Sequence, residues 1–447
     1  MIMRSTVALG HGIRLNEQLR KTLGVEGLAR TLFLSTQMTD QDINLSMPPA
    51  DQVPMAMAVP VTATATVLPN QGTQHMHANH QPKGMSWNPN TLSGDLDRDQ
   101  ILQLKDQGFP TGLAQEMGTT RATYPLRFWV VDNSGSMRTN DGHELRGTAQ
   151  ALRVVDCNRW KELQGSVAYH IELAGLLQAT TIFRLLNHPG VRAGQQEFSV
   201  AENGPDRTLI AQEVSRAKAI IQQSEPRGVT PLTEHLRVIR QRIESVQHIL
   251  NSQGQQAVIV LATDGLPSNN QGESTEYVRQ EFIQALKSLQ SLPVWVVVRL
   301  CTDDDNVVDY YNDLDNVLEL PLEVIDDFFG EGKEIHAANK WLNYTLPLHR
   351  CREMGYHHRV FDLLDERLLN KDELVVFLQL VFGRSAMDGA PDPHADWKGF
   401  HDWVSRIVKA EPKQFNPNTK KSEYWIDLKQ LDKSYGKGGF RLFRKKH

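Results

Sequence analysis

The sequence has few cysteines, no long apolar run and no excess of basic residues. Its 447 residues include only three cysteines, too few for a disulfide framework, which favours a reducing compartment. No apolar run reaches the roughly 18 residues of a membrane-spanning helix. Lysine and arginine total 48 against 53 acidic residues, and the net charge of −5 argues against a nucleic-acid binder. We therefore expect a cytoplasmic protein without a membrane span and without nucleic-acid partners.

The N-terminal part of the chain has a different composition from the rest. Residues 37–90 are rich in proline, methionine, alanine, threonine and glutamine without any period, which predicts a disordered arm over 1–92. Residues 1–35 contain several arginines and an apolar periodicity, which is also typical of an organellar targeting segment. Glu17 and Glu26 argue against that alternative, and a short surface helix or disordered head is the simpler interpretation.

A short helical arm is predicted over 93–121, with a turn at Gly108–Phe109–Pro110. The fragment LKDQGFPTGLAQEM resembles the first half of a ubiquitin-associated domain, in which a Gly-Phe loop joins two helices. The resemblance implies ubiquitin as a partner, but the third helix of that domain is missing here. The alternative is an arm that packs on the domain that follows.

Alternating strand and helix patterns over 122–328 predict an α/β domain. Short, continuous apolar runs such as Phe128–Val131, Val258–Ala262 and Val294–Val298 suit strands buried on both faces of a mostly parallel sheet. Helix-period segments separate them, which predicts a doubly wound, Rossmann-like fold with helices on both faces. The segment 138–158 reads as a hairpin insertion with Asp141–Gly142 at its turn.

The remainder of the chain, beyond residue 328, has a helical period. Apolar residues recur at helical spacing as far as Ile407, which predicts a C-terminal helical module over 329–410. A polar and basic tail is expected over 411–447.

Oxygen-bearing side chains follow the predicted strands where a ligand site of an open α/β sheet is expected. The first strand runs into Asp132–Asn133–Ser134–Gly135–Ser136, an Asp-x-Ser-x-Ser pattern. Thr230 lies in a loop just before a helix, and Asp264 follows a second buried strand. Two carboxylates and three hydroxyls suit one hard divalent cation, Mg²⁺ or Mn²⁺, held partly through water. Neutral ligands leave such an ion electrophilic toward an incoming carboxylate.

This combination resembles the von Willebrand factor A (VWA) domain and its metal-ion-dependent adhesion site. The family's five positions are matched by Asp132, Ser134, Ser136, Thr230 and Asp264. The resemblance implies that Ser134, Ser136 and Thr230 lie nearest the metal, with the aspartates acting directly or through water. It also implies that an acidic residue of a partner protein completes the coordination.

The residues of this site are compatible with three functions, and also with a purely structural role in which Asp132 and the serines only cap a helix. The first is a non-enzymatic interaction module that binds a partner carboxylate through the metal. The second is an accessory subunit of a machine such as a chelatase or ATPase complex. The ATPase would be a separate chain, because Gly330–Lys333 is followed by Glu334 where a phosphate loop needs serine or threonine. The third is a hydrolase or transferase that uses the metal for catalysis. A serine nucleophile would need a Gly-x-Ser-x-Gly elbow, and position 132 is aspartate, whereas a phosphoryl-transfer aspartate would need a lysine and a second carboxylate nearby. We predict the first function.

Overall fold

The computed structural model describes residues 93–147 and 152–436. The predicted N-terminal arm, its targeting alternative and the last residues of the basic tail lie outside the described residues. Two helices open the described part, α2 (Arg98–Asp106) and α3 (Thr111–Thr123), joined by the predicted Gly-Phe turn. No helix of the described part is both long and apolar enough to cross a membrane.

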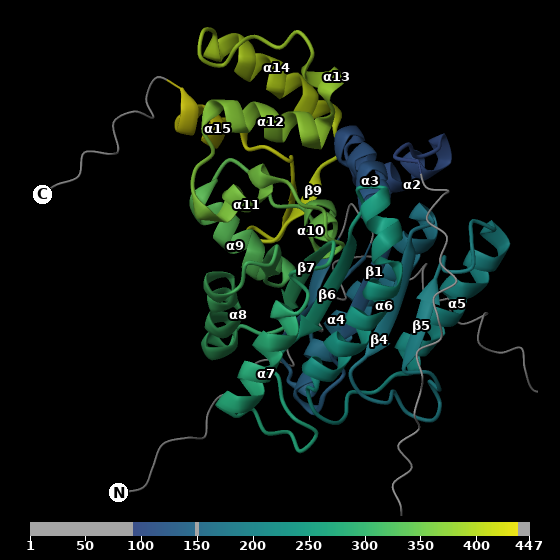
Figure 1. Cartoon of the computed structure of the whole chain (residues 1–447). Helices are drawn as coiled ribbons and strands as arrows, with labels where there is room; N and C mark the ends of the chain where they lie inside the picture. Colours follow the sequence, from purple (N-terminus) through teal and green to yellow (C-terminus); the bar gives the residue numbers. More distant parts are fainter. Residues whose placement is uncertain (1–92, 148–151, 437–447) are drawn as a thin grey trace, which may run out of the picture. The chain divides into compact units, whose positions relative to one another are not determined.

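A six-stranded sheet forms the centre of the fold (Figure 1). Its strand order is β5-β4-β1-β6-β7-β8, and every neighbouring pair is parallel except β4 with β5. The prediction of an α/β fold with a mostly parallel sheet is therefore confirmed. The last strand of the sheet, β8, was not predicted from the sequence. The strands are β1 (Leu126–Val131), β4 (Thr180–Leu185), β5 (Glu197–Val200), β6 (Ala257–Thr263), β7 (Val294–Leu300) and β8 (Leu322–Ile325).

Helices cover both faces of this sheet because alternate side chains of each strand point to opposite sides. Phe128 and Val130 share one apolar cluster with α6 (Leu232–Ser252), α7 (Glu276–Lys287) and α8 (Asp305–Val317). Trp129 and Val131 share the cluster of the other face with the two remaining crossover helices. These are α4 (Arg159–Leu177) and α5 (Arg207–Gln223).

The C-terminal segment completes the second face of the sheet. Arg127, buried in β1, donates from Nε to the carbonyl of Met354 at 3.2 Å. A Cβ on Gly355 would come within 2.7 Å of a Val258 methyl, and the His357 ring stacks 3.9 Å from that of Trp295. Because these contacts join residues on both sides of position 328, the predicted boundary between sheet domain and helical module stays a prediction.

A buried ion cluster joins the same two segments. The Glu353 carboxylate, at the end of α10 (Leu346–Glu353), is paired with Arg299 of β7 and with Arg350. His170 of α4 lies 3.0 Å from Glu353 Oε2 and Ser166 donates to Oε1 at 2.9 Å. The nearby cations hold the pKa of the Glu353 carboxyl well below its usual range despite complete burial. The cluster therefore fastens α10 to the sheet through charge-assisted hydrogen bonds.

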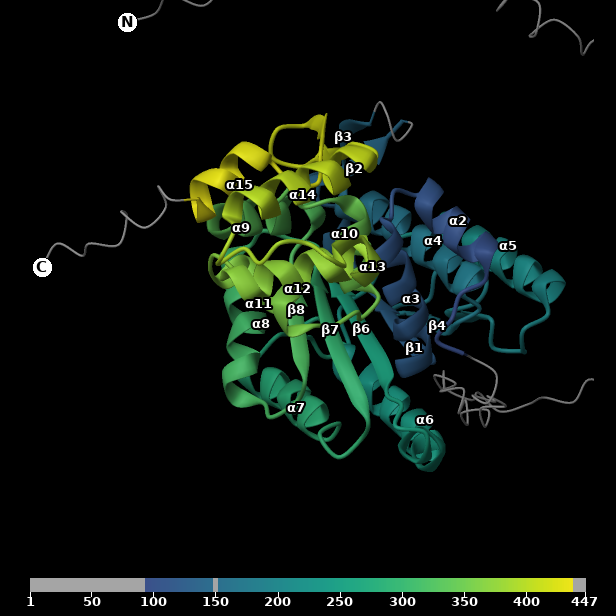
Figure 2. The same cartoon turned by 90° about the horizontal axis from the view of Figure 1, so that it is seen from above.

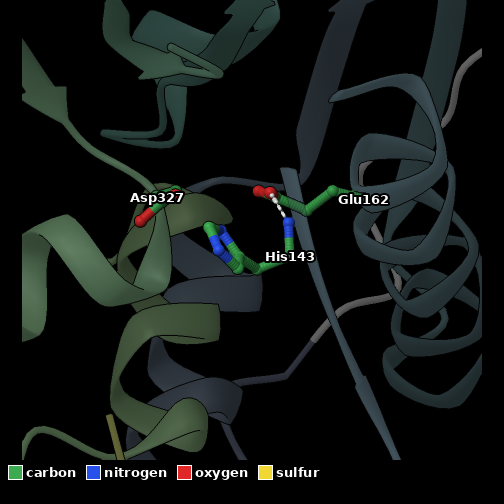
Figure 3. Close-up of side chains that lie close together, drawn as sticks. All are labelled: His143, Glu162 and Asp327. Carbon is green, nitrogen blue, oxygen red and sulfur yellow. Dashed lines mark hydrogen bonds between the residues drawn. The ribbon is translucent and has the colours of Figure 1, made fainter. Parts of the chain in front are cut away.

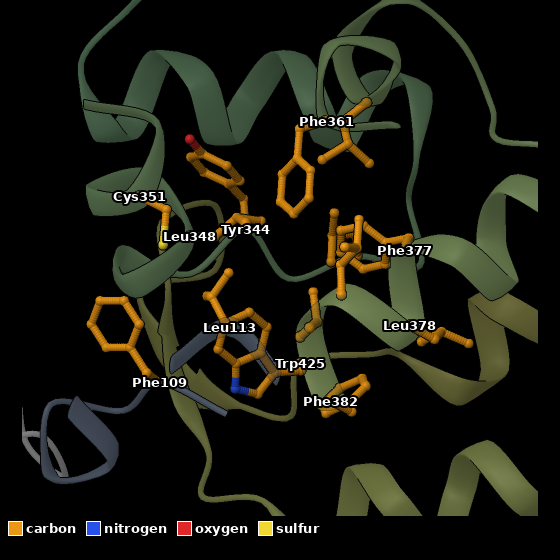
Figure 4. Close-up of a cluster of buried hydrophobic side chains, with 14 of the residues drawn as sticks. Phe109, Leu113, Tyr344, Leu348, Cys351, Phe361, Phe377, Leu378, Phe382 and Trp425 are labelled. Atoms are coloured by element: carbon orange, nitrogen blue, oxygen red, sulfur yellow. The ribbon is translucent and has the colours of Figure 1, made fainter. Parts of the chain in front are cut away.

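The chain after β8 is mainly helical and shares one apolar core with the N-terminal arm (Figure 4). Phe109 and Leu113 of the arm pack with Phe382 and Trp425 in this core. Gly112 of α3 approaches Gly383 so closely that an added Cβ would lie 2.2 Å from its backbone nitrogen. Figures 1 and 2 both show α3 beside the C-terminal helices. The helices are α9 (Phe328–Ala338), α10, α11 (Arg359–Glu366), α12 (Lys371–Phe382), α13 (Arg384–Met387), α14 (Trp397–Ala410) and α15 (Leu428–Tyr435).

Two predictions differ from the structure in detail. The hairpin is present as β2 (Gly142–Arg146) and β3 (Arg153–Cys157), but Asp141–Gly142 is not its turn. Gly142 instead opens the first strand and pairs with Cys157, at a position where a Cβ would lie 2.9 Å from the Asn158 carbonyl. A glycine is needed there for close backbone approach and not for a turn.

The expected polar tail is also partly ordered. Residues 414–435 form β9 (Gln414–Asn416), β10 (Lys421–Glu423) and α15, and Trp425 is fully buried. Leu428, Leu431 and Tyr435 recur at helical spacing within α15, a short pattern that the surrounding polar residues outnumber. The segment is held in place by contacts with distant residues, such as the hydrogen bond from Asn343 N to the Trp425 carbonyl.

Candidate metal centre

The two aspartates of the predicted site leave neighbouring strands at the same edge of the sheet. β1 and β6 are parallel and in register, with Val131 opposite Ala262. Asp132 N donates to the Ala262 carbonyl at 2.9 Å, which extends this pairing by one residue. Asp264 follows β6 directly, so both carboxylates stand at the carboxyl end of the sheet, where α/β ligand sites form.

Hydrogen bonds connect four of the five predicted residues into one continuous line. Ser134 N donates to Asp132 Oδ1 at 2.8 Å, and the hydroxyls of Ser134 and Ser136 lie 2.9 Å apart. Ser136 Oγ in turn donates to Asp264 Oδ1 at 2.7 Å. The line runs from the end of β1, through the 3-10 turn Gly135–Arg138, to the end of β6. The Asp-x-Ser-x-Ser spacing thus turns its side-chain oxygens toward the second strand.

The fifth residue, Thr230, lies on the loop before α6. Its backbone N donates to Ser268 Oγ, and Ser268 N donates back to the Thr230 carbonyl, both at 2.9 Å. Its Oγ1 lies 3.9 Å from the position that a Cβ on Gly265 would take, which places the hydroxyl beside the residue that follows Asp264. The predicted loop therefore reaches the end of β6.

Gly228 holds this loop against the Asp-x-Ser-x-Ser turn. Its φ of +80° favours glycine, and a Cβ there would lie 2.2 Å from Asn187 Oδ1. The Gly228 carbonyl accepts from Gly135 N at 3.1 Å, and Asn187 also bonds to Asn133. Sequence reasoning missed Asn187, because only its contacts with two distant loops distinguish it.

Two further residues contact the aspartates and were not predicted. Thr263 Oγ1 donates to Asp132 Oδ2 at 2.7 Å, so both oxygens of that carboxylate are oriented. Arg159, the first residue of α4, donates to Asp264 Oδ2 at 3.0 Å and pairs with Asp141 of the insertion. Thr263 could have been suspected as the neighbour of Asp264. No local pattern marks Arg159, whose partner lies far along the chain.

The electrostatics of the centre show negative charge that the protein only partly compensates. Burial, and then the charge of Asp264, raises the pKa of Asp132 to about 6. Burial also raises the pKa of Asp264, although Ser136 and Arg159 act in the opposite direction. The bonds to Asp141 and Asp264 raise the pKa of the Arg159 guanidinium, which remains charged. Arg159 therefore supplies the centre with one cationic partner, which is bonded to Asp264.

These donors fit a hard divalent cation. Carboxylate and hydroxyl oxygens are the ligands that Mg²⁺ prefers, and two carboxylates would balance its charge. Asp132, Ser134, Thr230 and Asp264 are buried, whereas Ser136 is exposed. Solvent or a partner thus reaches the oxygen cluster on the side of Ser136.

Comparisons with known proteins add no functional information. No protein-family model matches the chain, and no curated protein is significantly similar to it. The functional argument therefore depends on the geometry of this centre.

Proposed function

We propose that the chain is a VWA-like, non-enzymatic interaction protein that binds a partner's carboxylate through a divalent cation. Asp132, Ser134, Ser136, Thr230 and Asp264 would hold Mg²⁺ or Mn²⁺, and the partner would complete its coordination. The observation that carries this proposal is the line of hydrogen bonds that links Asp132, through Ser134 and Ser136, to Asp264. When bound, the cation supplies the positive charge that attracts the partner's carboxylate.

The serines of the site are poorly arranged for nucleophilic catalysis. Ser136 Oγ donates its proton to Asp264, and Ser134 Oγ is bonded to Ser136. In the part of the chain that the structure describes, no histidine is hydrogen-bonded to either hydroxyl, so neither serine has the general base that acyl transfer requires. This arrangement favours cation binding over hydrolysis.

The main alternative role of these residues is purely structural. In that case Asp132 would only orient the following turn through Ser134 N. A structural role would not explain why the hydroxyls of Ser134 and Ser136 form a hydrogen-bonded line to Asp264. Asp264 follows β6 and is more than a hundred residues away in the sequence. A shared cation explains the convergence, and its charge would offset the burial that raises the pKa values of the two carboxyls.

Direct cation binding is the first test. Isothermal titration of the EDTA-treated chain with Mn²⁺, competed by Mg²⁺, should show a site that Asp132→Asn and Ser136→Ala each remove. Asp206→Asn is a matched control, because Asp206 caps α5 through its carboxylate and is exposed. Unchanged binding by Asp132→Asn would contradict the proposal.

Partner binding is the second test. The chain and its Asp132→Asn variant would be used as bait in Mg²⁺ and in EDTA. A protein retained only by the unaltered chain in Mg²⁺ should lose binding when its own contacting aspartate or glutamate is replaced by an amide. If retained proteins are the same in all conditions, the cation does not mediate recognition.

A further inference from the structure

A second group of potential cation ligands lies on the other side of the hairpin insertion. His143 of β2, Glu162 of α4 and Asp327, which caps α9, each offer a ligand atom within 4.8 Å of the others (Figure 3). The group joins three segments that are far apart in the sequence. None of the three residues belongs to the Asp132–Asp264 centre.

The histidine of this group has an unsatisfied ring nitrogen. His143 Nδ1 is buried and has no hydrogen-bond partner among the described residues. Its other nitrogen, Nε2, faces outward and lies 3.8 Å from Asp156 Oδ1. A buried polar atom without a partner costs about 1–3 kcal/mol, so native structures seldom keep one unless a ligand or water satisfies it.

The two carboxylates are held in place and keep free lone pairs. Glu162 accepts from Arg299 at one oxygen, at 2.7 Å, and from His143 N at the other, at 2.8 Å. Asp327 uses Oδ1 to cap the helix through Phe329 N and Gly330 N, which leaves Oδ2 outside the cap. Each carboxylate oxygen has two lone pairs, so both groups can still bind a cation.

Acidic residues around the group exceed the cations that face them. Burial raises the pKa of Asp303, and the charges of Asp327 and Asp141 raise it further. The charge of Lys333 opposes this shift without cancelling it. The region therefore favours an added positive charge.

We infer that His143, Glu162 and Asp327 form a second cation site, which takes a divalent transition metal such as Zn²⁺. Imidazole nitrogen and carboxylate oxygen are both ligands that Zn²⁺ accepts, whereas Mg²⁺ prefers oxygen alone. The site borders a cavity of about 220 Å³ lined also by His349 and Arg350, from which water or a small anion can reach a fourth coordination position. The bound metal fastens the hairpin to α4 and α9.

Cobalt absorption is the most direct probe. The full chain, stripped with a chelator, would carry Asp132→Asn together with His75→Ala, His77→Ala and His80→Ala. These changes remove the first cation centre and the histidines of the N-terminal arm as competing ligands. Titration with Co²⁺ should produce visible d–d bands that saturate at one metal per chain and are displaced by Zn²⁺ but not by Mg²⁺. Absence of the bands overturns the inference and leaves the proposed function of the first centre unaffected.

Variants in the same background locate the site. Asp327→Asn retains an oxygen for the helix cap but loses the charge, and His143→Gln keeps a polar side chain. Each should weaken Co²⁺ binding by at least about tenfold, since even outer-shell changes cost that much. Asp206→Asn is the matched control, because Asp206 caps α5 through Thr208 N and Leu209 N in the same way.

Thermal unfolding provides an independent readout. Saturating Zn²⁺ should raise the midpoint of the background chain and of Asp206→Asn, but not that of Asp327→Asn. If Asp327→Asn and His143→Gln fold normally and bind Co²⁺ as tightly as the background, the assignment is wrong.

Discussion

Two buried carboxylate centres, one at Glu353 and one at Asp132 and Asp264, differ in how their charge is compensated. Glu353 is paired with Arg299 and Arg350 and accepts further hydrogen bonds, and its carboxyl pKa is held well below the usual range. Asp132 and Asp264 have raised pKa values, and the one guanidinium of the centre, that of Arg159, is bonded to Asp264. A carboxylate that is paired with arginine side chains stabilises the fold. A pair of carboxylates with too few such partners is suited to binding an external cation.

The largest effect should come from breaking the compensated centre. Glu353→Gln leaves the partly buried Arg350 without its anion and the buried Arg299 with Glu162 as its remaining carboxylate, and removal of one partner of a buried ion pair costs about 3–5 kcal/mol. Urea unfolding should show this loss in the free energy of unfolding at pH 7. The control is Glu366→Gln, an exposed glutamate of α11. A loss no greater than the control's would mean that the cluster does not fasten α10.

The same centre should make stability depend on pH. Burial lowers the pKa of His170 to about 4, from 6.5 in the unfolded chain. Between these values the unfolded chain binds a proton that the folded chain does not. Stability should therefore fall as pH drops from 6.5 to 4, by up to about 3 kcal/mol.

His170→Gln isolates this contribution. Glutamine can still bond to Glu353 but does not titrate, so its stability should change less over this window. Glu353 itself adds little above pH 4.5, because its lowered pKa affects stability only at more acid pH. Equal slopes for the two proteins between pH 6.5 and 4.5 would show that His170 is not held neutral.

The uncompensated centre should respond in the opposite direction. Asp132→Asn removes one of two buried like charges, and the amide oxygen can still accept from Ser134 N. In EDTA at pH 7 we expect the variant to be more stable than the parent by about 1–3 kcal/mol. In Mg²⁺ at 100 times its dissociation constant the parent should gain about 2.7 kcal/mol and the variant nothing. A variant that is less stable than the parent in EDTA would contradict the comparison.

The sheet and most of the Asp132–Asp264 centre could be predicted from the sequence, because both depend on patterns of neighbouring residues. Val258–Ala262 is a continuous apolar run, and the residue types that follow such a run are visible locally. Asp132 and Asp264 were placed together because parallel strands end at one edge, which the register of β1 and β6 confirms. Whether a cation binds there stays a prediction.

What could not be predicted depends on contacts between distant residues. In the sequence, nothing distinguishes Arg159 from other arginines at the start of a helix, because its partner Asp264 is distant along the chain. Likewise, His143 and Asp327 have no common pattern in the sequence, and Trp425 lies in a segment whose polar composition predicts an exposed tail. Such positions carry no period, so only the three-dimensional arrangement reveals their roles.

The smallest effect, and the finest test of the comparison, concerns Arg159. Its guanidinium is the one cation that the described chain bonds to Asp264, so an incoming metal must compete with it. Arg159→Gln should therefore tighten Mn²⁺ binding, by up to about tenfold if a charge-assisted hydrogen bond of about 1.5 kcal/mol is lost. Arg138→Gln is the control, because Arg138 ends the 3-10 turn that contains Ser136 but, within the described residues, its side chain donates to the Pro226 carbonyl and not to Asp264. Weaker binding by Arg159→Gln would mean that the arginine orients the Asp264 carboxylate for the metal. The difference between this centre and the Glu353 centre would then not be its uncompensated charge.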